Sequence, residues 1–394
     1  MSERKVVAVM VGTRPEAIKM APIALEMRRR DGIIARLVST GQHDEMLAHG
    51  LRVFGLTPDA ELAVMRPDQT LSALSARLIT EIDRVFVDMK PSMVLVQGDT
   101  ATTFFAGLVG FYLRIPIGHV EAGLRTRDKR NPFPEEIYRR MTTAVADVHF
   151  AATEGARTNL LAEGVPAEAV CVTGNPVIDA LHYVAGREEP RVLQEGGLDS
   201  WLDPARRLIL VTAHRRESFG EGLDAICRAV RAVAARFADS VQVVFPVHLN
   251  PSVRRHVYGH LSDVPNVRLL PPLDYQKFVA LLRRSYLVMT DSGGLQEEAP
   301  AFGKPTLVMR ETTERTEAID AGCARLVGVR ESRITAEVVR LLEEPDAYET
   351  MAVVRSPFGD GHAAPRIVDV VERMLRRAVN PPVAIAGVFR TADR

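Results

Sequence analysis

The sequence predicts an α/β protein with two Rossmann-like, doubly wound domains and an active-site cleft between them. Three observations lead to this fold class. Short runs rich in β-branched residues alternate with longer amphipathic segments, the alternation starts again in the second half, and 394 residues exceed what one compact core usually holds. Open parallel sheets bind ligands beyond the carboxyl ends of their strands, so two facing sheets place the site in the cleft.

The apolar runs of the first half predict buried parallel strands, and the segments between them have helical periodicity. The predicted strands cover residues 6–11, 35–39, 93–96 and 148–151, and the helices 15–30, 71–88 and 103–113. In the second half, strands are predicted at 208–212, 241–246, 267–270, 287–290 and 306–309, and helices at 222–237, 275–284 and 335–342.

The domain boundary is predicted where this alternation restarts, just before a polar stretch. Residues 1–175 form the predicted N-terminal Rossmann-like domain, and residues 176–365 form the C-terminal one. Residues 366–394 are predicted to form a closing helix and a loose tail.

The composition excludes several function classes. Lys+Arg and Asp+Glu both total 50, so no overall field favours nucleic acid or an anionic membrane. The three cysteines form no C-x-x-C pair, which favours reduced thiols over a zinc site. No signal peptide opens the chain, and no apolar run reaches the roughly 18 residues of a membrane span. We therefore expect a cytoplasmic protein that binds neither nucleic acid nor membrane.

The segment from residue 116 to 140 combines carboxylates with arginines, which predicts acid/base chemistry beside phosphate. Glu121 follows a strand among small and apolar residues, a setting that raises a carboxyl pKa toward neutrality, although a surface loop glutamate is the alternative. Glu135 and Arg139 lie four apart on one predicted helix face, so an ion pair there is compatible with a catalytic role. Several of the other arginines are expected at the surface.

Two turns of the first domain follow strands. The turn from Gly12 to Lys19 predicts a helix N-terminus that attracts anions with help from Arg14 and Lys19, or else a plain strand–helix turn. It is neither a Walker loop nor a dinucleotide fingerprint. Asp99 follows Gly98 at a strand end, where it can reach the cleft or cap the next helix.

Two motifs of the second domain also follow strands. His214, beside two arginines, is a candidate general acid or phosphate ligand, whereas His248 alone is a weak signal. Ser292 and Gly293 open a helix after a buried strand, which predicts a phosphate cradle of backbone amides rather than a bare turn. Glu298, one turn later, is placed for ribose hydroxyls.

Together these motifs resemble the non-hydrolysing UDP-N-acetylglucosamine 2-epimerase family over nearly the whole chain. The matching segments are residues 12–19, 98–100, 119–126, 132–136, 214–218, 246–251 and 291–300. The resemblance implies a glycosyltransferase-B-like fold, a homodimer, and reversible conversion of UDP-N-acetylglucosamine to UDP-N-acetylmannosamine without NAD or a metal. It also implies that UDP is eliminated and added back through a 2-acetamidoglucal.

The resemblance further assigns roles to individual residues and makes the second domain the UDP-binding one. The implied catalytic residues are Asp99, Glu121, Glu135 and His214. The implied substrate contacts are Arg14, Lys19, Arg139 and His214 for the diphosphate, Ser292 and Gly293 for phosphate, Glu298 for ribose, and the backbone near Phe278 for uracil.

Some members of the family bind a second UDP-N-acetylglucosamine as an activator. The matching positions here are Gln42, Glu45, Arg215 and His248. Glu45 and Asp68 depart from the family by adding negative charge, which should weaken an anionic effector. Three other enzymes stay open as alternatives: a 2-epimerase of a UDP-2,3-diacetamido uronic acid, a hydrolysing epimerase, and a nucleotide-sugar glycosyltransferase. An inactive binding protein is the non-enzyme alternative.

Overall fold

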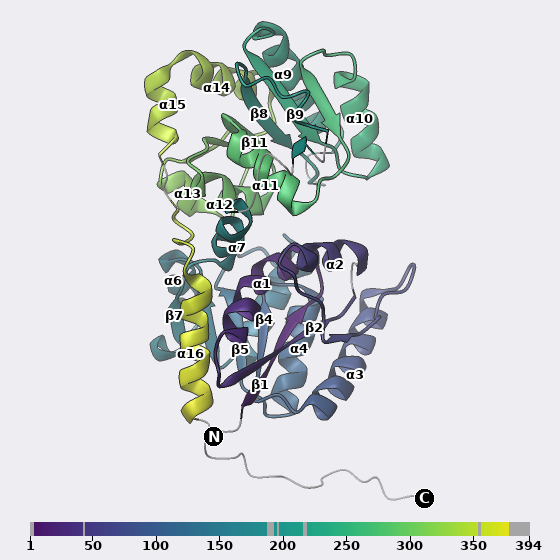
Figure 1. The fold of residues 1–394 in the computed structure, drawn as a ribbon, viewed down its shortest axis with the longest axis vertical. Coiled ribbons are helices and arrows are strands. Elements are labelled where there is room, and N and C mark those ends of the chain that lie inside the picture. The colour runs from purple at the N-terminus through teal and green to yellow at the C-terminus, as the bar shows by residue number, and fades with distance from the viewer. Residues whose placement is uncertain are drawn as a thin grey trace, which may run out of the picture.

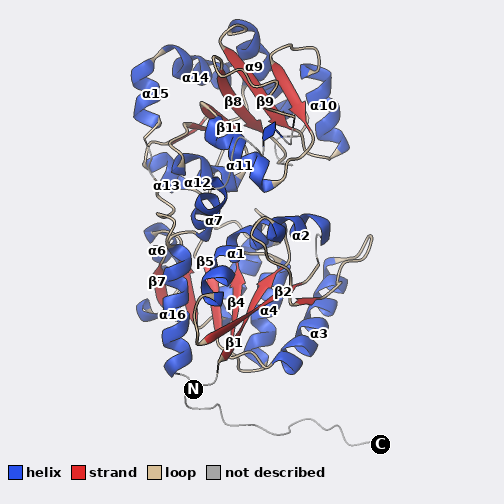
Figure 2. Cartoon of the chain, viewed as in Figure 1, coloured by secondary structure: helices blue, strands red, loops and turns tan. Residues whose placement is uncertain are grey.

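The computed structural model describes residues 4–41, 44–186, 193–194, 197–215, 219–353 and 356–377. Two α/β domains lie one above the other, joined by α7 and by the chain that returns to α16 (Figure 1). Within each domain the strands lie inside and helices cover both faces (Figure 2). In these described parts, the strands form one seven-stranded and one six-stranded sheet, both parallel, which confirms the predicted fold class.

The first sheet has the order β3-β2-β1-β4-β5-β6-β7. Its strands are β1 (Lys5–Val11), β2 (Ile33–Ser39), β3 (Ala60–Glu61), β4 (Met93–Gln97), β5 (Ile117–Ala122), β6 (Val148–Ala151) and β7 (Val170–Val172). The helices around it are α1 (Arg14–Arg28), α2 (Asp44–Arg52), α3 (Leu71–Met89), α4 (Ala101–Tyr112), α5 (Glu135–Val145) and α6 (Glu154–Ala162), with a short 3-10 helix at Ala167–Ala169. The central strands are almost wholly apolar because helices bury both faces of the sheet.

The second sheet has the order β10-β9-β8-β11-β12-β13. Its strands are β8 (Arg207–Thr212), β9 (Val241–Pro246), β10 (Val267–Leu270), β11 (Leu287–Thr290), β12 (Thr306–Val308) and β13 (Ala324–Leu326). Its helices are α9 (Glu221–Arg236), α10 (Pro251–Leu261), α11 (Tyr275–Arg284), α12 (Gly293–Ala301), α13 (Thr316–Asp320), α14 (Glu331–Glu343) and α15 (Pro345–Met351).

The strand order reverses once in each sheet, and this reversal positions the site. The switch lies between β1 and β4 in the first sheet and between β8 and β11 in the second. At such a switch the connections leave toward opposite faces, which opens a crevice at the carboxyl ends of the strands. The motifs that follow β1, β4, β8 and β11 therefore lie around two crevices that face each other.

Two helices fasten the domains together. The first, α7 (Pro176–Ala185), packs against α1 of the first domain and against α11 and α12 of the second. The second, α16 (Ala363–Arg377), returns to pack on α1 and α7. Asp179 accepts hydrogen bonds from the first amides of α16, those of Ala363 at 3.1 Å and Ala364 at 2.8 Å. The boundaries predicted at residues 175 and 365 stay predictions.

The two connecting segments cross at a pair of glycines. A Cβ on Gly174 would lie 3.1 Å from the Cα of Gly359, and both residues have positive φ angles, 85° and 130°. Only glycine allows both the close approach and this backbone conformation at low cost.

Most predicted elements match the observed ones to within a few residues. The predicted strand 148–151 and helix 275–284 coincide with β6 and α11. Several helices were not predicted, among them α7, α10 and α15. Buried residues lie on nearly every side of α7, so it lacks the polar stripe by which a surface helix is recognised.

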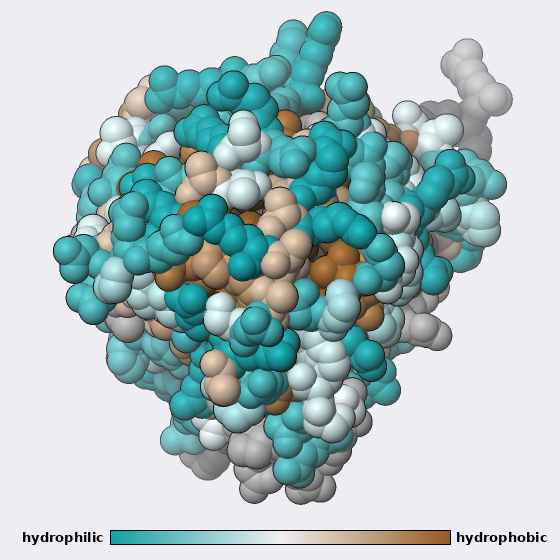
Figure 3. Space-filling model, turned by 90° about the horizontal axis from the view of Figure 1, so that it is seen from above, coloured by the Kyte–Doolittle hydropathy of each residue, from teal (hydrophilic) through white to brown (hydrophobic). Residues whose placement is uncertain are grey.

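None of the described helices is long and apolar enough to cross a membrane. Viewed from the second-domain end, the surface is mostly hydrophilic with apolar atoms near its centre (Figure 3). A groove between α9 and α14 is floored by alanines and valines such as Ala225, Ala232 and Val339, and bordered by Arg228 and Glu331. None of the predicted site residues lines this groove.

Candidate active site

Glu121 lies at the end of β5 in a conformation that few residues other than glycine adopt. Its φ angle is 59°, and the pairing of β5 with β6 shifts register between Val120 and Ala122. A left-handed non-glycine residue at a bulge costs roughly 1–3 kcal/mol, and such strain persists only where the surroundings enforce it. The carboxylate of Glu121 is thereby fixed at the carboxyl end of the sheet, facing the second domain.

Three donors hold the Glu121 carboxylate. Nζ of Lys19 lies 2.6 Å from Oε1, Nδ2 of Asn175 lies 2.9 Å from the same oxygen, and Nε2 of Gln97 donates to Oε2. Lys19 comes from α1, Gln97 from the end of β4, and Asn175 from the segment before α7. All four side chains are buried.

The prediction that the pKa of Glu121 is raised toward neutrality is wrong. Burial does act to raise it, but the charges of Lys19 and Arg315 and the hydrogen bonds outweigh burial, so the pKa lies below its ordinary value. The neighbours in sequence are apolar, as expected, whereas the neighbours in space carry positive charge. Glu121 is therefore ionised in the folded protein.

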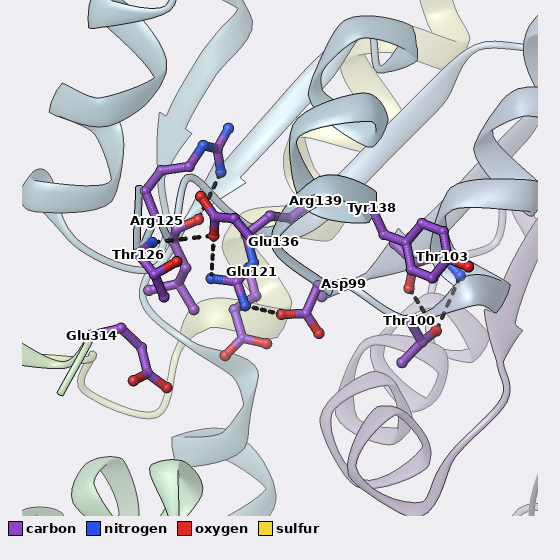
Figure 4. Close-up of polar contacts among 12 residues, drawn as sticks. Asp99, Thr100, Thr103, Glu121, Arg125, Thr126, Glu136, Tyr138, Arg139 and Glu314 are labelled. Carbon is purple, nitrogen blue, oxygen red and sulfur yellow. Dashed lines mark hydrogen bonds and ion pairs between the residues drawn. The ribbon is translucent and has the colours of Figure 1, made fainter. Parts of the chain in front are cut away.

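Asp99 and Arg139 form an ion pair beside this group (Figure 4). Nη1 of Arg139 also lies 3.4 Å from Oε2 of Glu136, which is completely buried. Glu136 accepts hydrogen bonds from the backbone amides of Thr126 at 3.1 Å and Arg127 at 3.2 Å. Glu136 thus fixes both the loop after β5 and the guanidinium that holds Asp99.

Two local predictions about this region are wrong. Thr100, not Asp99, caps α4, because its hydroxyl accepts a hydrogen bond from the amide of Thr103 at 3.2 Å. The carboxylates that Arg139 contacts within the described structure are Asp99 and Glu136, and Glu135 is not among them. Glu135 is half-buried at the first position of α5. Glu136 and Arg139 share a helix face at i,i+3 spacing, and this pair replaces the predicted i,i+4 pair.

The arginines of the segment after β5 divide into two groups. The side chain of Arg125 is buried and lies 2.8 Å from the carboxylate of Glu163. Arg127, Arg130 and Arg140 are exposed, as expected for most of this group.

The turn that opens α1 is held by a buried acid. Glu16 accepts hydrogen bonds from the amide of Gly12 at 3.0 Å and from the hydroxyls of Thr13 and Thr100 at 2.8 and 2.7 Å. Arg14 extends from this turn to the second domain, where its Nη1 lies 3.4 Å from the carbonyl oxygen of Leu273. Lys19, one turn further along α1, is ion-paired with Glu121.

His214 follows β8 on the opposite side of the cleft. Its backbone amide and that of Arg215 both donate to Oδ2 of the buried Asp291, each at 2.8 Å. Nδ1 of His214 lies 3.4 Å from Oδ1 of Asp291, and its ring stacks on that of His248 at 5.7 Å. Burial, the largest effect, lowers the pKa of His214, although Asp291 opposes the shift. His214 is therefore neutral near pH 7, and could donate one proton or accept one.

The predicted phosphate cradle lies at the N-terminus of α12. Ser292 is the N-cap residue, and the helix begins at Gly293. A Cβ on Gly293 would lie 2.7 Å from the guanidinium of Arg315, so glycine leaves room for that side chain. The first amides of a helix have no partners within it, so this end can bind an anion.

Glu298 lies on α12 next to α11. Its Oε1 accepts a hydrogen bond from the hydroxyl of Tyr275 at 2.7 Å, and both residues are buried. Burial raises the pKa of Glu298 to about 7. Phe278, also on α11, uses its own amide to bond the carbonyl oxygen of Asp274 at 3.0 Å.

The predicted regulatory positions are partly outside the described structure. Gln42 and the side chain of Glu45 lie outside the described residues. Arg215 and His248 flank His214, so these two positions adjoin the candidate active site. In the described part of the chain, no group of three or more His, Cys, Asp or Glu could hold a metal ion.

The site also contains residues that the sequence did not single out. They are Glu16, Gln97, Asn175, Tyr275, Glu297 and Arg315. Two signals were present: Asn175 lies in a Gly-Asn-Pro turn, and Glu297 stands next to Glu298. No local pattern marks Arg315, whose partner Glu297 lies on α12.

Comparisons with known proteins agree with this geometry. The family model described as UDP-N-acetylglucosamine 2-epimerase matches residues 25–372. A Salmonella typhimurium UDP-N-acetylglucosamine 2-epimerase is 48% identical over 93% of this chain and 98% of its own length. This chain belongs to the UDP-N-acetylglucosamine 2-epimerase family.

Solved structures of the epimerase family share the fold. The enzyme from Neisseria meningitidis, bound to UDP-GlcNAc, has a TM-score of 0.88 and 43% identity over 94% of this chain and 100% of its own. The Methanocaldococcus jannaschii epimerase, in complex with UDP-GlcNAc and UDP, has a TM-score of 0.79 and 28% identity over 93% of this chain and 99% of its own. The shared arrangement of two facing parallel-sheet domains is glycosyltransferase-B-like.

The raised pKa of Glu298 predicts a pH-dependent effect on stability. Its pKa is about 7 in the folded protein against an ordinary 4.5, so the folded state binds this proton more tightly than the unfolded chain does. The resulting stabilisation is present below pH 4.5 and is lost as pH rises to 7, a change of up to about 3 kcal/mol. Replacing Glu298 by Gln removes this loss and lets Tyr275 keep an acceptor.

We expect Glu298→Gln and the parent chain to unfold at similar urea concentrations at pH 4.5. At pH 8 the variant should need more urea. The exposed Glu168, changed to Gln, serves as the control and should behave like the parent chain at both values. An equal difference between Glu298→Gln and the parent at both pH values would contradict the raised pKa.

Proposed function

We propose that this protein interconverts UDP-N-acetylglucosamine and UDP-N-acetylmannosamine by eliminating UDP and adding it back through a 2-acetamidoglucal. The observation that carries the proposal is the position of Glu121. This ionised, strained carboxylate shares Lys19 and Asn175 with Glu297 on α12, the helix of the other domain whose N-terminus is the predicted phosphate cradle. A base thus faces a nucleotide-binding surface, and relatives of this chain are named for the same reaction.

The reaction requires both halves of the cleft. Removal of the proton at sugar carbon 2 leaves an electron pair that forms the double bond to carbon 1 as the bond from carbon 1 to UDP oxygen breaks. The leaving diphosphate gains negative charge, which positive groups and helix amides stabilise. Return of UDP to carbon 1, with protonation at the opposite face of carbon 2, gives the epimer.

Inversion needs proton transfer on both faces of carbon 2, so more than one acid/base group is required. We assign Asp99, Glu121 and Glu135 to this set, without dividing the faces among them. His214, neutral near pH 7, is suited to donate a proton to the leaving oxygen. The route moves a proton and a leaving group but no hydride, so it requires no NAD. We assign the stabilisation of the leaving diphosphate to positive side chains and helix amides rather than to a metal.

The remaining contacts follow from position. The diphosphate would lie at the N-terminus of α12, against the hydroxyl of Ser292 and the amide of Gly293, because the amide of Ser292 already donates to the hydroxyl of Thr290 at 2.9 Å. We assign four side chains to it: Arg14, Lys19 and Arg139 from across the cleft, and His214 from the second domain itself. Glu298 would accept from the ribose hydroxyls. The amide of Phe278 is already used within α11, so uracil would contact neighbouring backbone groups.

The alternatives differ in their products. A hydrolysing epimerase would release free N-acetylmannosamine and UDP. A glycosyltransferase would need an acceptor and would leave carbon 2 untouched. A 2-epimerase of a diacetamido uronic acid would prefer that nucleotide over UDP-N-acetylglucosamine. A binding protein would exchange no proton.

One experiment separates these functions. Incubation of the protein with UDP-N-acetylglucosamine in deuterium oxide should give UDP-N-acetylmannosamine, with deuterium at carbon 2 of both sugars, without an acceptor. Mass spectrometry and NMR measure the label. Glu121→Gln should reduce exchange at least about a hundredfold, because the amide cannot take the proton. Its affinity for UDP should stay within about threefold of the parent, because the helix N-terminus and the ribose and uracil contacts lie on the second domain and Glu121 is not itself assigned to the nucleotide.

The matched control is Glu168→Gln, an exposed position distant from the cleft, which should exchange at the parent rate. Retention of the parent rate in Glu121→Gln would remove Glu121 from the acid/base set. Absence of exchange in the parent chain would refute the epimerase proposal itself.

We also propose a second UDP-sugar site next to His214. Nε of Arg215 is buried without a hydrogen-bond partner among the described residues, and His248 is exposed beside His214. An effector diphosphate there would pair with Arg215, while Glu45 and Asp68 would limit its affinity. One solved relative holds both UDP-GlcNAc and UDP.

The second site predicts cooperative kinetics. Initial rates should rise sigmoidally with UDP-N-acetylglucosamine, and UDP-N-acetylmannosamine alone should turn over slowly until a little UDP-N-acetylglucosamine is added. Arg215→Ala should make the rate curve less sigmoidal, because the side chain assigned to the effector is lost. The hydrogen bond from the backbone amide of residue 215 to Asp291 is kept. A hyperbolic curve in the parent, with full-rate turnover of UDP-N-acetylmannosamine alone, would dispose of the second site.

We infer a homodimer in the cytoplasm. Val87, Phe111 and Tyr112 are exposed apolar side chains near the C-terminal ends of α3 and α4, which pack together, and exposed apolar clusters commonly mark interfaces. Sedimentation should give twice the 43.4 kDa of the chain. Tyr112→Lys should favour the monomer, whereas Glu168→Lys, at an exposed position of the same domain outside α3 and α4, should not. A parent chain that sediments at 43.4 kDa would contradict the dimer.

A further inference from the structure

The Glu121 carboxylate shares its donors with a second buried carboxylate, that of Glu297 on α12. Nδ2 of Asn175 lies 2.9 Å from Oε1 of Glu121 and 3.0 Å from Oε2 of Glu297. Nζ of Lys19 lies 2.6 and 3.8 Å from the same two oxygens. Two acids that come from different domains therefore compete for one amide and one ammonium group.

Asn175 is fixed where the chain crosses between the domains. Its amide donates to the carbonyl oxygen of Phe358 at 2.6 Å, and its Oδ1 accepts from the amide of Val177 as the N-cap of α7. Because these two hydrogen bonds restrain the backbone and Oδ1 of Asn175, the position of its Nδ2 group is fixed. That position lies between the carboxylates of Glu121 and Glu297.

Glu297 is held on its other side by Arg315. Nε of Arg315 lies 2.7 Å from Oε1 of Glu297, and the same guanidinium pairs with Glu314. Arg315 also occupies the space beside Gly293, at the start of the helix proposed to bind the diphosphate. The chain of contacts thus joins that helix N-terminus to Glu121.

We propose that Asn175 and Glu297 are positioning residues for the proton transfer at Glu121. Glu297 competes with Glu121 for the ammonium group of Lys19 and for the side-chain amide of Asn175. Glu121 therefore stays basic enough to accept the proton of carbon 2. Because Glu297 belongs to the second domain, this balance is present only when the two domains are in contact. The inference rests on the proposed function.

The charged groups that face Glu121 come from three elements. Lys19 lies on α1, Glu297 on α12, and Arg315 in the segment before α13. His119 on the same strand is completely buried, and burial lowers its pKa to about 3, so it stays neutral. Burial raises the pKa of Glu297, so the two carboxylates titrate as an interacting pair. Loss of the Glu297 carboxylate leaves Lys19 to Glu121 alone and lowers the pKa of Glu121. Loss of the Asn175 amide removes a donor to the charged form and raises it.

Two variants test these opposite directions. Glu297→Gln removes a charge with little change of shape. Asn175→Ser keeps a good N-cap for α7 but is too short to reach Glu121. The measurement is kcat/KM for deuterium exchange at carbon 2 of UDP-N-acetylglucosamine as a function of pH. The acidic limb of this pH profile should shift to lower pH by about one unit in Glu297→Gln and to higher pH by about one unit in Asn175→Ser.

Glu317→Gln is the matched control. Glu317 also bonds across the domains, accepting from the hydroxyl of Thr153 at 2.6 Å, and among the described contacts it shares no donor with Glu121. Its acidic limb should coincide with that of the parent. The affinity for UDP, measured by calorimetry, should stay within about threefold in all variants.

The outcomes separate the inference from the proposed function. Absence of exchange in the parent at every pH refutes the proposed function. The positioning role is refuted if the parent exchanges the proton but the acidic limbs of Glu297→Gln and Asn175→Ser coincide with the limb of the parent. It is also refuted if both limbs shift in the same direction. Simple loosening of the domain contact would lower the rates of both variants without moving their limbs apart. Opposite shifts support the role.

Discussion

The structure depends on one constraint: an ionised carboxylate is buried where two domains meet. Burying such a charge is costly unless opposite charge and hydrogen bonds surround it. Glu121 meets this condition with Lys19, Gln97 and Asn175. The β5 bulge, the direction of α1 and the segment before α7 bring those donors together. The strained φ angle of Glu121 is consistent with a position that its surroundings enforce.

The topology explains why these groups converge. Strand order reverses at β1/β4 and at β8/β11, so residues directly after these strands face the crevice. On the first domain this places carboxylates in the cleft, and on the second it places helix amides and a histidine there. Arg14 then contacts the second domain at Leu273, and Asn175 contacts the connecting segment at Phe358. Strand order therefore determines which groups each domain contributes to the cleft, and individual side chains determine the detailed contacts.

Local sequence predicted the fold and the strand-end motifs, because periodicity and turn residues act over a few positions. It failed where partners are distant along the chain. The apolar neighbours of Glu121 suggested a raised pKa, but Lys19 lies 102 positions away in sequence and reverses the shift. Arg139 has two acids within reach along its helix, and only the packing of α5 selects Glu136. The missed helix α7 is buried on most sides, so it lacks the polar stripe of a surface helix.

Glu297 and Glu298 show how one helix can serve two purposes. Adjacent positions on a helix point about 100° apart, so the two acids face different neighbours. Glu298 meets Tyr275 on the side proposed for ribose, and Glu297 meets Arg315 and Asn175 on the side of Glu121. The N-terminus of the same helix faces the proposed diphosphate. A displacement of α12 on binding the nucleotide would therefore alter the donors available to Glu121, which connects recognition of UDP to the proton transfer through a single rigid element.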